Sequence, residues 1–124
     1  MNNNYIRKGI YTIDAVLSKI NYNKSIKIDF DGDLIKMTSQ RYLVFKHKGC
    51  MCVKCGLVGT FFAKEKTPTQ QGGFHFNLYG IKNGIEILFT KDHIIPKSKG
   101  GSNTINNYQT MCVICNNLKG NKYE

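Results

Sequence analysis

The last third of the chain gathers side chains that can act on a phosphodiester bond. A carboxylate stands directly before an imidazole at Asp92 and His93, and two asparagines follow at Asn107 and Asn116. An imidazole is largely neutral near pH 7 and can accept a proton from water, whereas carboxylate and amide oxygens suit a hard divalent ion. Because the chain carries a net charge of +10, we expect these groups to serve metal-dependent cleavage of a nucleic acid.

Two cysteine pairs with the same two-residue spacer predict a second, different metal site. Cys52 and Cys55 form the first pair, and Cys112 and Cys115 form the second. Each pair can place both sulfurs on one ion, so the two pairs together supply the four ligands of a tetrahedral structural Zn²⁺ site. A reactive dithiol needs only one such pair and is the less favoured interpretation. Cys50 is expected to be a spare thiol.

Length and composition limit the kinds of protein that remain. A chain of 124 residues with 41% hydrophobic residues can form one modest core, to which a bound ion would add stability. The sequence shows no signal peptide, which predicts a cytoplasmic protein whose thiols stay reduced. It contains no apolar segment long enough to span a bilayer, so no membrane partner is expected.

The N-terminal part of the chain is expected to hold a short helix and a β-hairpin. Apolar residues recur at helical spacing from Ile10 to Ile20. Two alternating segments, residues 25–30 and 33–37, flank Asp31-Gly32, which is a strong hairpin turn signal.

The middle of the chain predicts a helix, a loop and a second hairpin. Thr38 or Ser39 can cap a helix that Gly49 would end. Residues 59–73 contain glycine and proline among polar residues, so we expect a surface loop there. Beyond them, Asn83-Gly84 separates two strand-like segments and predicts a tight hairpin turn.

The candidate catalytic and metal-binding residues are expected on two strands and one helix. The strands are predicted at residues 85–95 and 108–111, with Gly100-Gly101 in the loop between them and a helix that starts near residue 112. Four residues of this helix fall at positions i, i+3, i+4 and i+7 and therefore share one face: Cys112, Cys115, Asn116 and Lys119. The zinc site is thus expected to support the helix that presents Asn116.

Taken together, these residues resemble the HNH endonuclease motif, in the form with a four-cysteine zinc site. The segments that carry the resemblance are Asp92-His93-Ile94-Ile95-Pro96, Gly100-Gly101, Asn107-Tyr108-Gln109 and Cys112-x-x-Cys115-Asn116-x-x-Lys119. Asn116 takes the third position of the motif, which makes this the His-Asn-Asn variant. The resemblance covers residues 45–122 and implies an α+β fold, with a small ββα-metal (His-Me finger) nuclease core and an N-terminal extension of hairpin and helix.

The resemblance divides the chain into two parts. Residues 45–124 are expected to form the HNH nuclease domain with its zinc site, and residues 1–44 form an N-terminal extension that the resemblance does not explain. Lysines and arginines keep this extension basic, so a role in DNA binding or in dimerisation is expected.

The resemblance also implies a role for each candidate residue. His93 is the general base, and Asp92 and Asn116 hold a catalytic Mg²⁺ or Mn²⁺ that stabilises the leaving oxygen. Asn107 braces the loop and orients His93. Four lysines are expected to contact nucleic-acid phosphates: Lys91, Lys97, Lys99 and Lys119.

Asp92 and His93 are neighbours on a predicted strand, so their side chains should point to opposite faces. Both can serve one site only if the strand end is twisted as the chain approaches Pro96. A His93 side chain that pointed into the core would contradict this assignment.

The function expected from the motif is hydrolysis of DNA phosphodiester bonds by a metal-dependent HNH endonuclease, through nicking or double-strand cleavage. The alternative is a zinc-stabilised nucleic-acid-binding protein without cleavage activity, which has no need to keep Asp92, His93 and Asn116 together. A monomer with one site would nick, whereas double-strand cutting would need a homodimer or two binding events. The abundance of Asn, Lys and Ile suggests a phage or mobile-element product that acts in the host cytoplasm.

Overall fold

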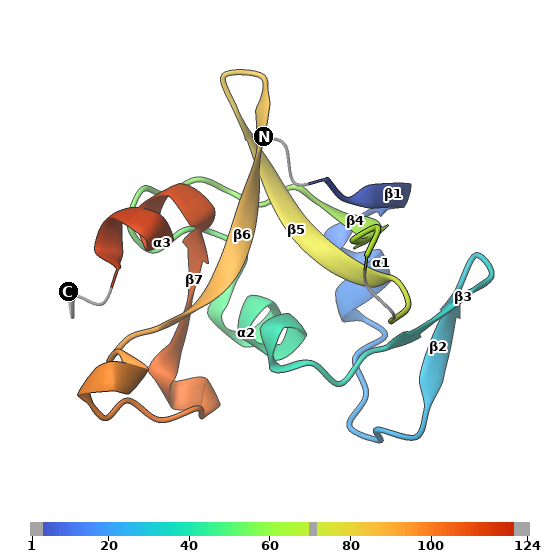
Figure 1. The fold of residues 1–124 in the computed structure, drawn as a ribbon, viewed down its shortest axis with the longest axis horizontal. Helices are drawn as coiled ribbons and strands as arrows, with labels where there is room; N and C mark the ends of the chain where they lie inside the picture. Colours follow the sequence, from blue (N-terminus) through green and yellow to red (C-terminus); the bar gives the residue numbers. More distant parts are fainter. Residues whose placement is uncertain (1–3, 70–71, 121–124) are drawn as a thin grey trace.

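The main sheet is antiparallel and contains strands from both halves of the chain (Figure 1). The structure is a computed structural model that describes residues 4–69 and 72–120. Within these residues the strand order is β1-β4-β5-β6-β7. The strands are β1 (Ile6–Tyr11), β4 (Phe61–Lys66), β5 (His75–Lys82), β6 (Ile85–His93) and β7 (Tyr108–Cys112).

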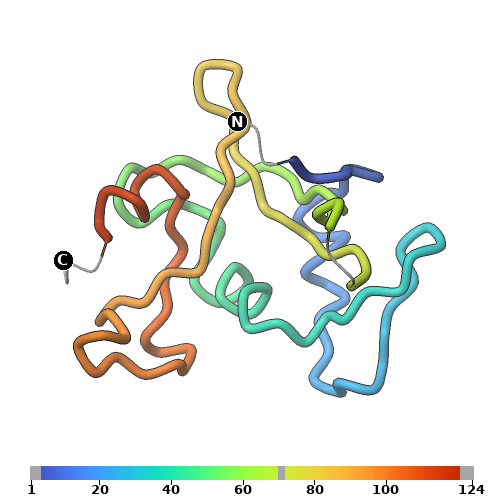
Figure 2. Tube along the Cα trace, in the orientation of Figure 1, coloured from blue at the N-terminus to red at the C-terminus, as the bar shows by residue number. Residues whose placement is uncertain are grey.

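A separate hairpin and several helices complete the fold. They are β2 (Lys27–Phe30), β3 (Asp33–Lys36), α1 (Ile13–Leu17), α2 (Gln40–Lys48), α3 (Val113–Lys119) and two short 3₁₀-helices, η1 (Lys97–Lys99) and η2 (Ile105–Asn107). The 3₁₀-helices lie in the loop that joins β6 to β7, which Figure 2 traces in orange. Helix α3 follows this strand pair and contacts both of its strands. The expected mixed α+β class is therefore confirmed.

Both predicted hairpin turns are confirmed. Strands β2 and β3 pair in antiparallel register across the first turn, and β5 and β6 pair across the second. Asp31 and Gly32 have φ angles of 54° and 95°, and Asn83 and Gly84 have φ angles of 52° and 77°. Two consecutive positive φ angles are what a type I′ turn requires, which is the physical reason that Asp-Gly and Asn-Gly are such informative pairs.

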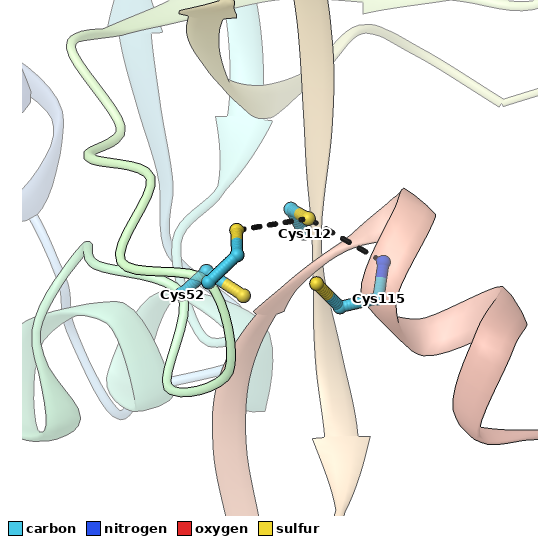
Figure 3. Close-up of side chains that lie close together, drawn as sticks. Cys52, Cys112 and Cys115 are labelled. Carbon is cyan, nitrogen blue, oxygen red and sulfur yellow. Dashed lines mark hydrogen bonds between the residues drawn. The ribbon is translucent and has the colours of Figure 1, made fainter.

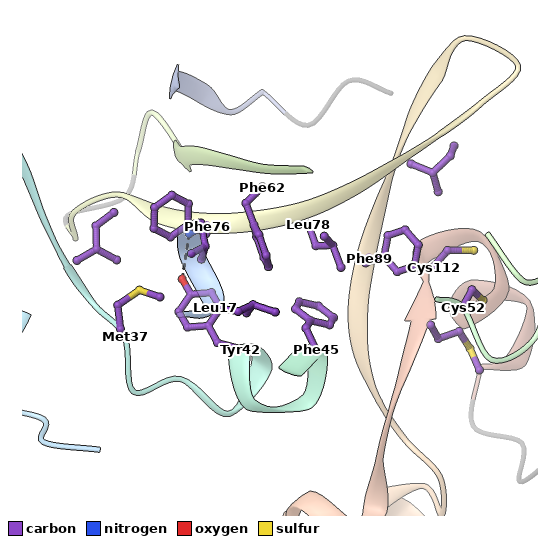
Figure 4. Packing of buried hydrophobic residues seen from close by; sticks show 14 of the residues in the cluster. Leu17, Met37, Tyr42, Phe45, Cys52, Phe62, Phe76, Leu78, Phe89 and Cys112 are labelled. Carbon is purple, nitrogen blue, oxygen red and sulfur yellow. Dashed lines mark hydrogen bonds between the residues drawn. The ribbon is translucent and has the colours of Figure 1, made fainter. Parts of the chain in front are cut away.

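Helix α2 begins and ends where its capping residues predict. The Ser39 hydroxyl accepts a hydrogen bond from the Arg41 backbone N–H, and Gly49 ends the helix with a φ of 92°. The buried face of α2 carries Tyr42 and Phe45, which pack against Phe62 and Phe76 of the sheet (Figure 4). The same apolar core extends to two of the predicted metal ligands, Cys52 and Cys112.

The prediction of a surface loop at residues 59–73 is wrong for residues 61–66, which form strand β4 near the middle of the sheet. The charged residues in this segment suggested exposure, yet Lys64 is buried. Its ammonium group lies 2.8 Å from Asp33 Oδ2 and 2.8 Å from the Phe30 carbonyl oxygen, both on the β2–β3 hairpin. A lysine can be buried when its charge is paired, and here the partners come from another part of the chain.

Glu65 is the second buried charge of β4, and it attaches β1 to the sheet. Its carboxylate accepts hydrogen bonds from Arg7 Nε at 2.6 Å, Asn77 Nδ2 at 2.8 Å and the Tyr79 hydroxyl at 2.6 Å. Arg7 lies on β1 and also donates to Glu86 on β6. These contacts hold the edge strand in place.

The helical prediction is wrong for Ile10, which lies on β1 opposite Ala63. Helix α1 is shorter than the apolar spacing suggested and begins after Thr12, whose hydroxyl caps it by accepting from the Ala15 backbone N–H. Apolar residues of a short strand followed by a short helix produced an apparent helical period.

None of the helices within residues 4–69 and 72–120 combines the length and the apolar character needed to cross a membrane.

Candidate active site and metal cluster

Four cysteines from two distant segments meet at the start of α3 (Figure 3). The sulfur atoms of Cys52, Cys55, Cys112 and Cys115 all lie within 4.8 Å of one another. The predicted pairing of the two spaced motifs is therefore confirmed, and the four side chains are positioned to bind one metal ion. Cys50 is not part of this cluster, and its sulfur instead faces the Phe45 carbonyl oxygen at 3.7 Å.

Backbone contacts hold the first cysteine pair in place. The Cys52 N–H donates to the Leu57 carbonyl oxygen at 2.8 Å, which closes a tight loop around the pair. The Val53 N–H donates to Thr110 on β7 at 3.1 Å, which joins this loop to the sheet. Cys112 Sγ in turn accepts from the Cys115 N–H at 3.5 Å and caps α3.

The environment shifts the pKa values of the thiols in opposite directions. Burial would raise the pKa of Cys52, but backbone hydrogen bonds from Cys112, Cys55 and Lys54 outweigh burial and lower this pKa to about 6. Burial and the neighbouring sulfurs raise the pKa of Cys115 well above its ordinary value. Crowded sulfurs that cannot all ionise by themselves suit a cation, which replaces their protons on binding.

Asp92 presents one free carboxylate oxygen. This residue is buried on β6, and its Oδ2 atom lies 3.0 Å from Gln109 Nε2 and 3.0 Å from Lys119 Nζ. Among the described residues, no hydrogen bond or ion pair involves the other oxygen, Oδ1. Gln109 and Lys119 therefore fix the orientation of the Asp92 carboxylate through one of its two oxygens.

Lys119 is buried at the centre of the site. Only 3% of the residue is exposed, and its ammonium group donates to the His93 carbonyl oxygen at 2.6 Å as well as contacting Asp92. The sequence predicted that Lys119 contacts phosphate, and this stays a prediction. The partners that the structure provides for Lys119 lie inside the protein.

His93 has a partner that the sequence did not reveal. Its Nε2 atom lies 2.8 Å from Asn103 Oδ1, and its ring packs on Tyr108 with 4.8 Å between ring centroids. Because an amide oxygen only accepts hydrogen bonds, this contact places the hydrogen on Nε2 and leaves Nδ1 as the proton acceptor. Asn103 lies in the β6–β7 loop, where no motif marks it.

One cavity of about 250 Å³ brings the candidate catalytic groups together. Asp92, His93 and Asn116 all line it, with Lys91 and Lys97 at its walls. The neighbouring Asp92 and His93 therefore both line one cavity, at the point where β6 ends. Lys99 lies on η1 and is not among the residues that line this cavity.

Asn107 holds the β6–β7 loop. Its side chain accepts from the Ile95 N–H at 2.9 Å and donates to the carbonyl oxygens of Ile95 at 3.1 Å and Ser102 at 2.8 Å. Its backbone carbonyl also accepts from the Ile94 N–H at 2.8 Å. Three of these four hydrogen bonds hold the backbone that directly follows His93, and the fourth holds Ser102 further along the loop.

Asn116 lies on α3 and faces the same cavity. Its Nδ2 atom donates to Thr90 Oγ1 on β6 at 2.8 Å, so its side-chain oxygen remains for a ligand. The sequence predicted that one helix would carry both metal ligands and Asn116. In the structure, α3 begins at the cysteine cluster and places Asn116 at the cavity.

These observations define a class: an α+β protein in which an antiparallel strand pair and a following helix surround a His, Asp and Asn constellation beside a four-cysteine cluster. Residues 83–124 match the family model described as HNH endonuclease. The resemblance inferred from the sequence is confirmed for this segment, which includes the second cysteine pair but not the first. Searches of curated proteins and of solved structures gave no match.

Proposed function

We propose that this protein is a metal-dependent HNH endonuclease that hydrolyses phosphodiester bonds of DNA. The observation that carries the proposal is that Asp92, His93 and Asn116 line one cavity within the segment that matches the HNH endonuclease family. In this proposal β6, β7 and α3 form the ββα-metal core, and the four cysteines hold a structural Zn²⁺ beside it.

The site offers ligands that fit a hard divalent ion. Asp92 Oδ1 and the side-chain oxygen of Asn116 are the free oxygen atoms, and Mg²⁺ and Mn²⁺ prefer such ligands. When bound there, the ion supplies Lewis-acid stabilisation of the leaving 3′-oxygen.

The protein side chains perform the remaining steps. His93 takes a proton from the attacking water at Nδ1, while its Nε2–H group donates to Asn103 and keeps the ring in one tautomer. Asn107 holds the loop behind His93, so the base keeps its position. Lys91 and Lys97 at the cavity, with Lys99 beyond it, attract the DNA phosphates, and Lys119 orients Asp92.

The wider assignments follow from this function as predictions. Residues 45–124 act as the nuclease domain, and residues 1–44 contribute to DNA binding or dimerisation, although β1 and β4 pair in one sheet across this boundary. The protein works in the cytoplasm as a monomer or a homodimer, and its composition is typical of phage or mobile-element products.

Incubation of zinc-loaded protein with supercoiled plasmid and Mg²⁺ or Mn²⁺ tests the proposal. We expect nicked circles that end in 5′-phosphate, and a loss of rate of at least about 10²-fold in His93→Ala, because a positioned base contributes that much. His47→Ala is the matched control, since His47 is exposed at the end of α2 and should cleave as the wild type does.

A zinc-stabilised binding protein without cleavage activity is the competing interpretation. It predicts that wild type and His93→Ala shift the plasmid equally in a gel and leave it equally intact under both metals. That outcome would remove the endonuclease assignment while retaining DNA binding.

A further inference from the structure

A cavity with a mixed charged and apolar lining lies away from the candidate active site. It has a volume of about 390 Å³ and lies between the β2–β3 hairpin, the first turn of α2 and the residues that lead into β5. We call it the hairpin pocket and define it by Lys27, Leu34, Lys36, Arg41 and Phe74. Its size suits one small ligand or one unit of a larger one.

The cations of the hairpin pocket form no ion pair with a carboxylate of residues 4–69 or 72–120. Lys27, Lys36 and Arg41 line it, and among the described lining residues none is acidic. Arg7 shows the contrast, because it is paired with two glutamates. Arg41 forms no ion pair with any described carboxylate, and it donates from Nη2 to the Phe76 carbonyl oxygen at 2.6 Å.

Arg41 also has an unused donor. Its Nε atom is buried and has no hydrogen-bond partner among residues 4–69 and 72–120. His75 lines the same pocket, and burial together with the nearby Arg41 charge lowers the pKa of its side chain. A guanidinium that is held by the Phe76 carbonyl oxygen and has no described carboxylate partner fits an anionic group such as phosphate.

The other wall of the hairpin pocket is apolar. Leu34 is 60% exposed on β3, although it is a large aliphatic residue, and Phe74 and Tyr42 lie in the same lining. A phosphate gains no binding energy from an apolar wall, whereas the flat face of a nucleobase is stabilised by packing against it. The combined lining therefore fits a nucleotide, with its phosphate on the cations and its base on the apolar side.

The first turn of α2 connects the hairpin pocket to the catalytic loop. Arg41 lines the pocket, and the adjacent Gln40 donates from Nε2 to the Asn103 carbonyl oxygen at 3.0 Å. The Asn103 side chain contacts His93. The first turn of α2 therefore joins the hairpin pocket to the loop that contacts His93.

We infer that the hairpin pocket binds one unpaired nucleotide of the DNA substrate, outside the site of cleavage. This inference rests on the proposed function, because it takes DNA as the substrate. A base inside a duplex has its faces covered by stacking, so only an unpaired base reaches the apolar wall.

Binding of a fluorescein-labelled single-stranded oligonucleotide by zinc-loaded His93→Ala protein tests the inference without cleavage. Adding Lys27→Gln and Lys36→Gln should weaken binding by about tenfold at low salt and make the slope of log K against log salt shallower by about 1.4, for two lost phosphate contacts. The matched control is Lys46→Gln with Lys48→Gln, two exposed lysines at the end of α2 outside the pocket lining, which should change the affinity by less than about twofold.

A second variant tests the base. Leu34→Ala should weaken binding of the ordinary oligonucleotide and leave binding of an abasic oligonucleotide, which keeps its phosphates, unchanged. Equal effects of the pocket and control lysine pairs, or no effect of Leu34→Ala, would overturn the inference. The inference would also be overturned if free deoxyadenosine monophosphate bound as tightly as the oligonucleotide. The pocket would then be a site for a free nucleotide.

The two proposals fail in different ways. Plasmid nicking by wild type tests the endonuclease function and does not depend on the binding measurements. If nicking is observed and the lysine variants bind as the controls do, only the hairpin pocket is wrong.

Discussion

At the residue scale, a buried lysine organises the carboxylate of the candidate site. Lys119 Nζ contacts Asp92 Oδ2 and the His93 carbonyl oxygen, and both Lys119 and Asp92 are almost fully buried. A buried charge without its partner is costly, so each of these residues depends on the other. The pair therefore connects the stability of the protein to the geometry of its candidate metal ligand.

We predict that Lys119→Met lowers the free energy of unfolding by about 3 kcal/mol, because it leaves Asp92 buried without its counter-charge. Adding Asp92→Asn should restore part of this loss. Urea denaturation of the zinc-loaded proteins measures both effects. Lys97→Met, at an exposed position, is the control, and an unchanged midpoint for Lys119→Met would show that the pair contributes nothing.

Substitution of two adjacent glycines in the β6–β7 loop, Gly100 and Gly101, should have different effects. A Cβ atom on Gly101 would lie 1.8 Å from the Ile95 carbonyl oxygen and 2.8 Å from Asn107 Nδ2, whereas a Cβ atom on Gly100 would meet no atom within 4 Å. Gly100 has a φ of 87°, so its replacement costs only backbone strain.

Gly101→Ala is therefore expected to displace the loop behind His93 and abolish nicking. Gly100→Ala should retain nicking and lose only about 1 kcal/mol of stability. Plasmid assays and urea denaturation on both variants check this. Retained nicking by Gly101→Ala would mean that the Asn107 hydrogen bonds do not position His93.

At the element scale, strand β1 depends on one arginine. Arg7 contacts Glu65, whose side chain is 2% exposed, and Glu86, whose side chain is 39% exposed. The β1–β4 pairing has a register shift beside Arg7, which makes the side-chain contacts of this edge strand more important.

We predict that Arg7→Ala lowers the free energy of unfolding by about 3 kcal/mol, because Glu65 then stays buried without a cation. Glu65→Gln in the same chain should recover part of the loss, since a neutral amide still bonds with Tyr79. Chemical denaturation of the single and double variants provides the comparison. Additive losses in the double variant would contradict the pairing.

The contact between Arg7 and Glu86 predicts how stability depends on pH. Hydrogen bonding to Arg7 lowers the pKa of Glu86 below its ordinary value of 4.5. A carboxylate whose folded-state pKa is lowered contributes stability above pH 4.5, and this contribution is lost as the pH falls through the folded-state pKa. Glu86→Gln should therefore show a smaller loss of melting temperature on acidification below pH 4.5 than wild type.

At the scale of the whole molecule, the cysteine cluster joins two segments that are distant in sequence. The loop after α2 supplies Cys52 and Cys55, and the β7–α3 junction supplies Cys112 and Cys115. Both segments also belong to the apolar core, through Cys52 and Cys112. An ion at the cluster would close a long loop and so stabilise the core and the catalytic helix together.

We predict that the purified protein contains about one Zn²⁺ per chain and that chelation lowers its melting temperature by roughly 10 °C or more. Cys115→Ser should lose most of the ion, whereas Cys50→Ser should retain it, because Cys50 lies outside the cluster. Elemental analysis with thermal denaturation measures both. Equal metal content in the two variants would exclude a four-sulfur site.

Local signals in the sequence determined several parts of this protein. Asp31-Gly32 and Asn83-Gly84 specify their hairpins because both turns need positive φ angles, and Ser39 and Gly49 specify the ends of α2 through capping. The spacing of the cysteines also sufficed to predict that the four of them meet, and the resemblance to the HNH motif predicted that Asp92, His93 and Asn116 share one cavity. In each case the physical cause lies within a few residues of chain or in the coordination chemistry of the side chains.

Tertiary structure alone decided the rest. Strand β4 is buried because Lys64 and Glu65 find partners on the β2–β3 hairpin and on β1, which no local pattern announces. Asn103 and Gln109 act on His93 and Asp92 because the loop and β7 bring them there. Sequence determines which chemical groups are available, whereas burial and pairing of charge depend on residues that meet only after the chain has folded.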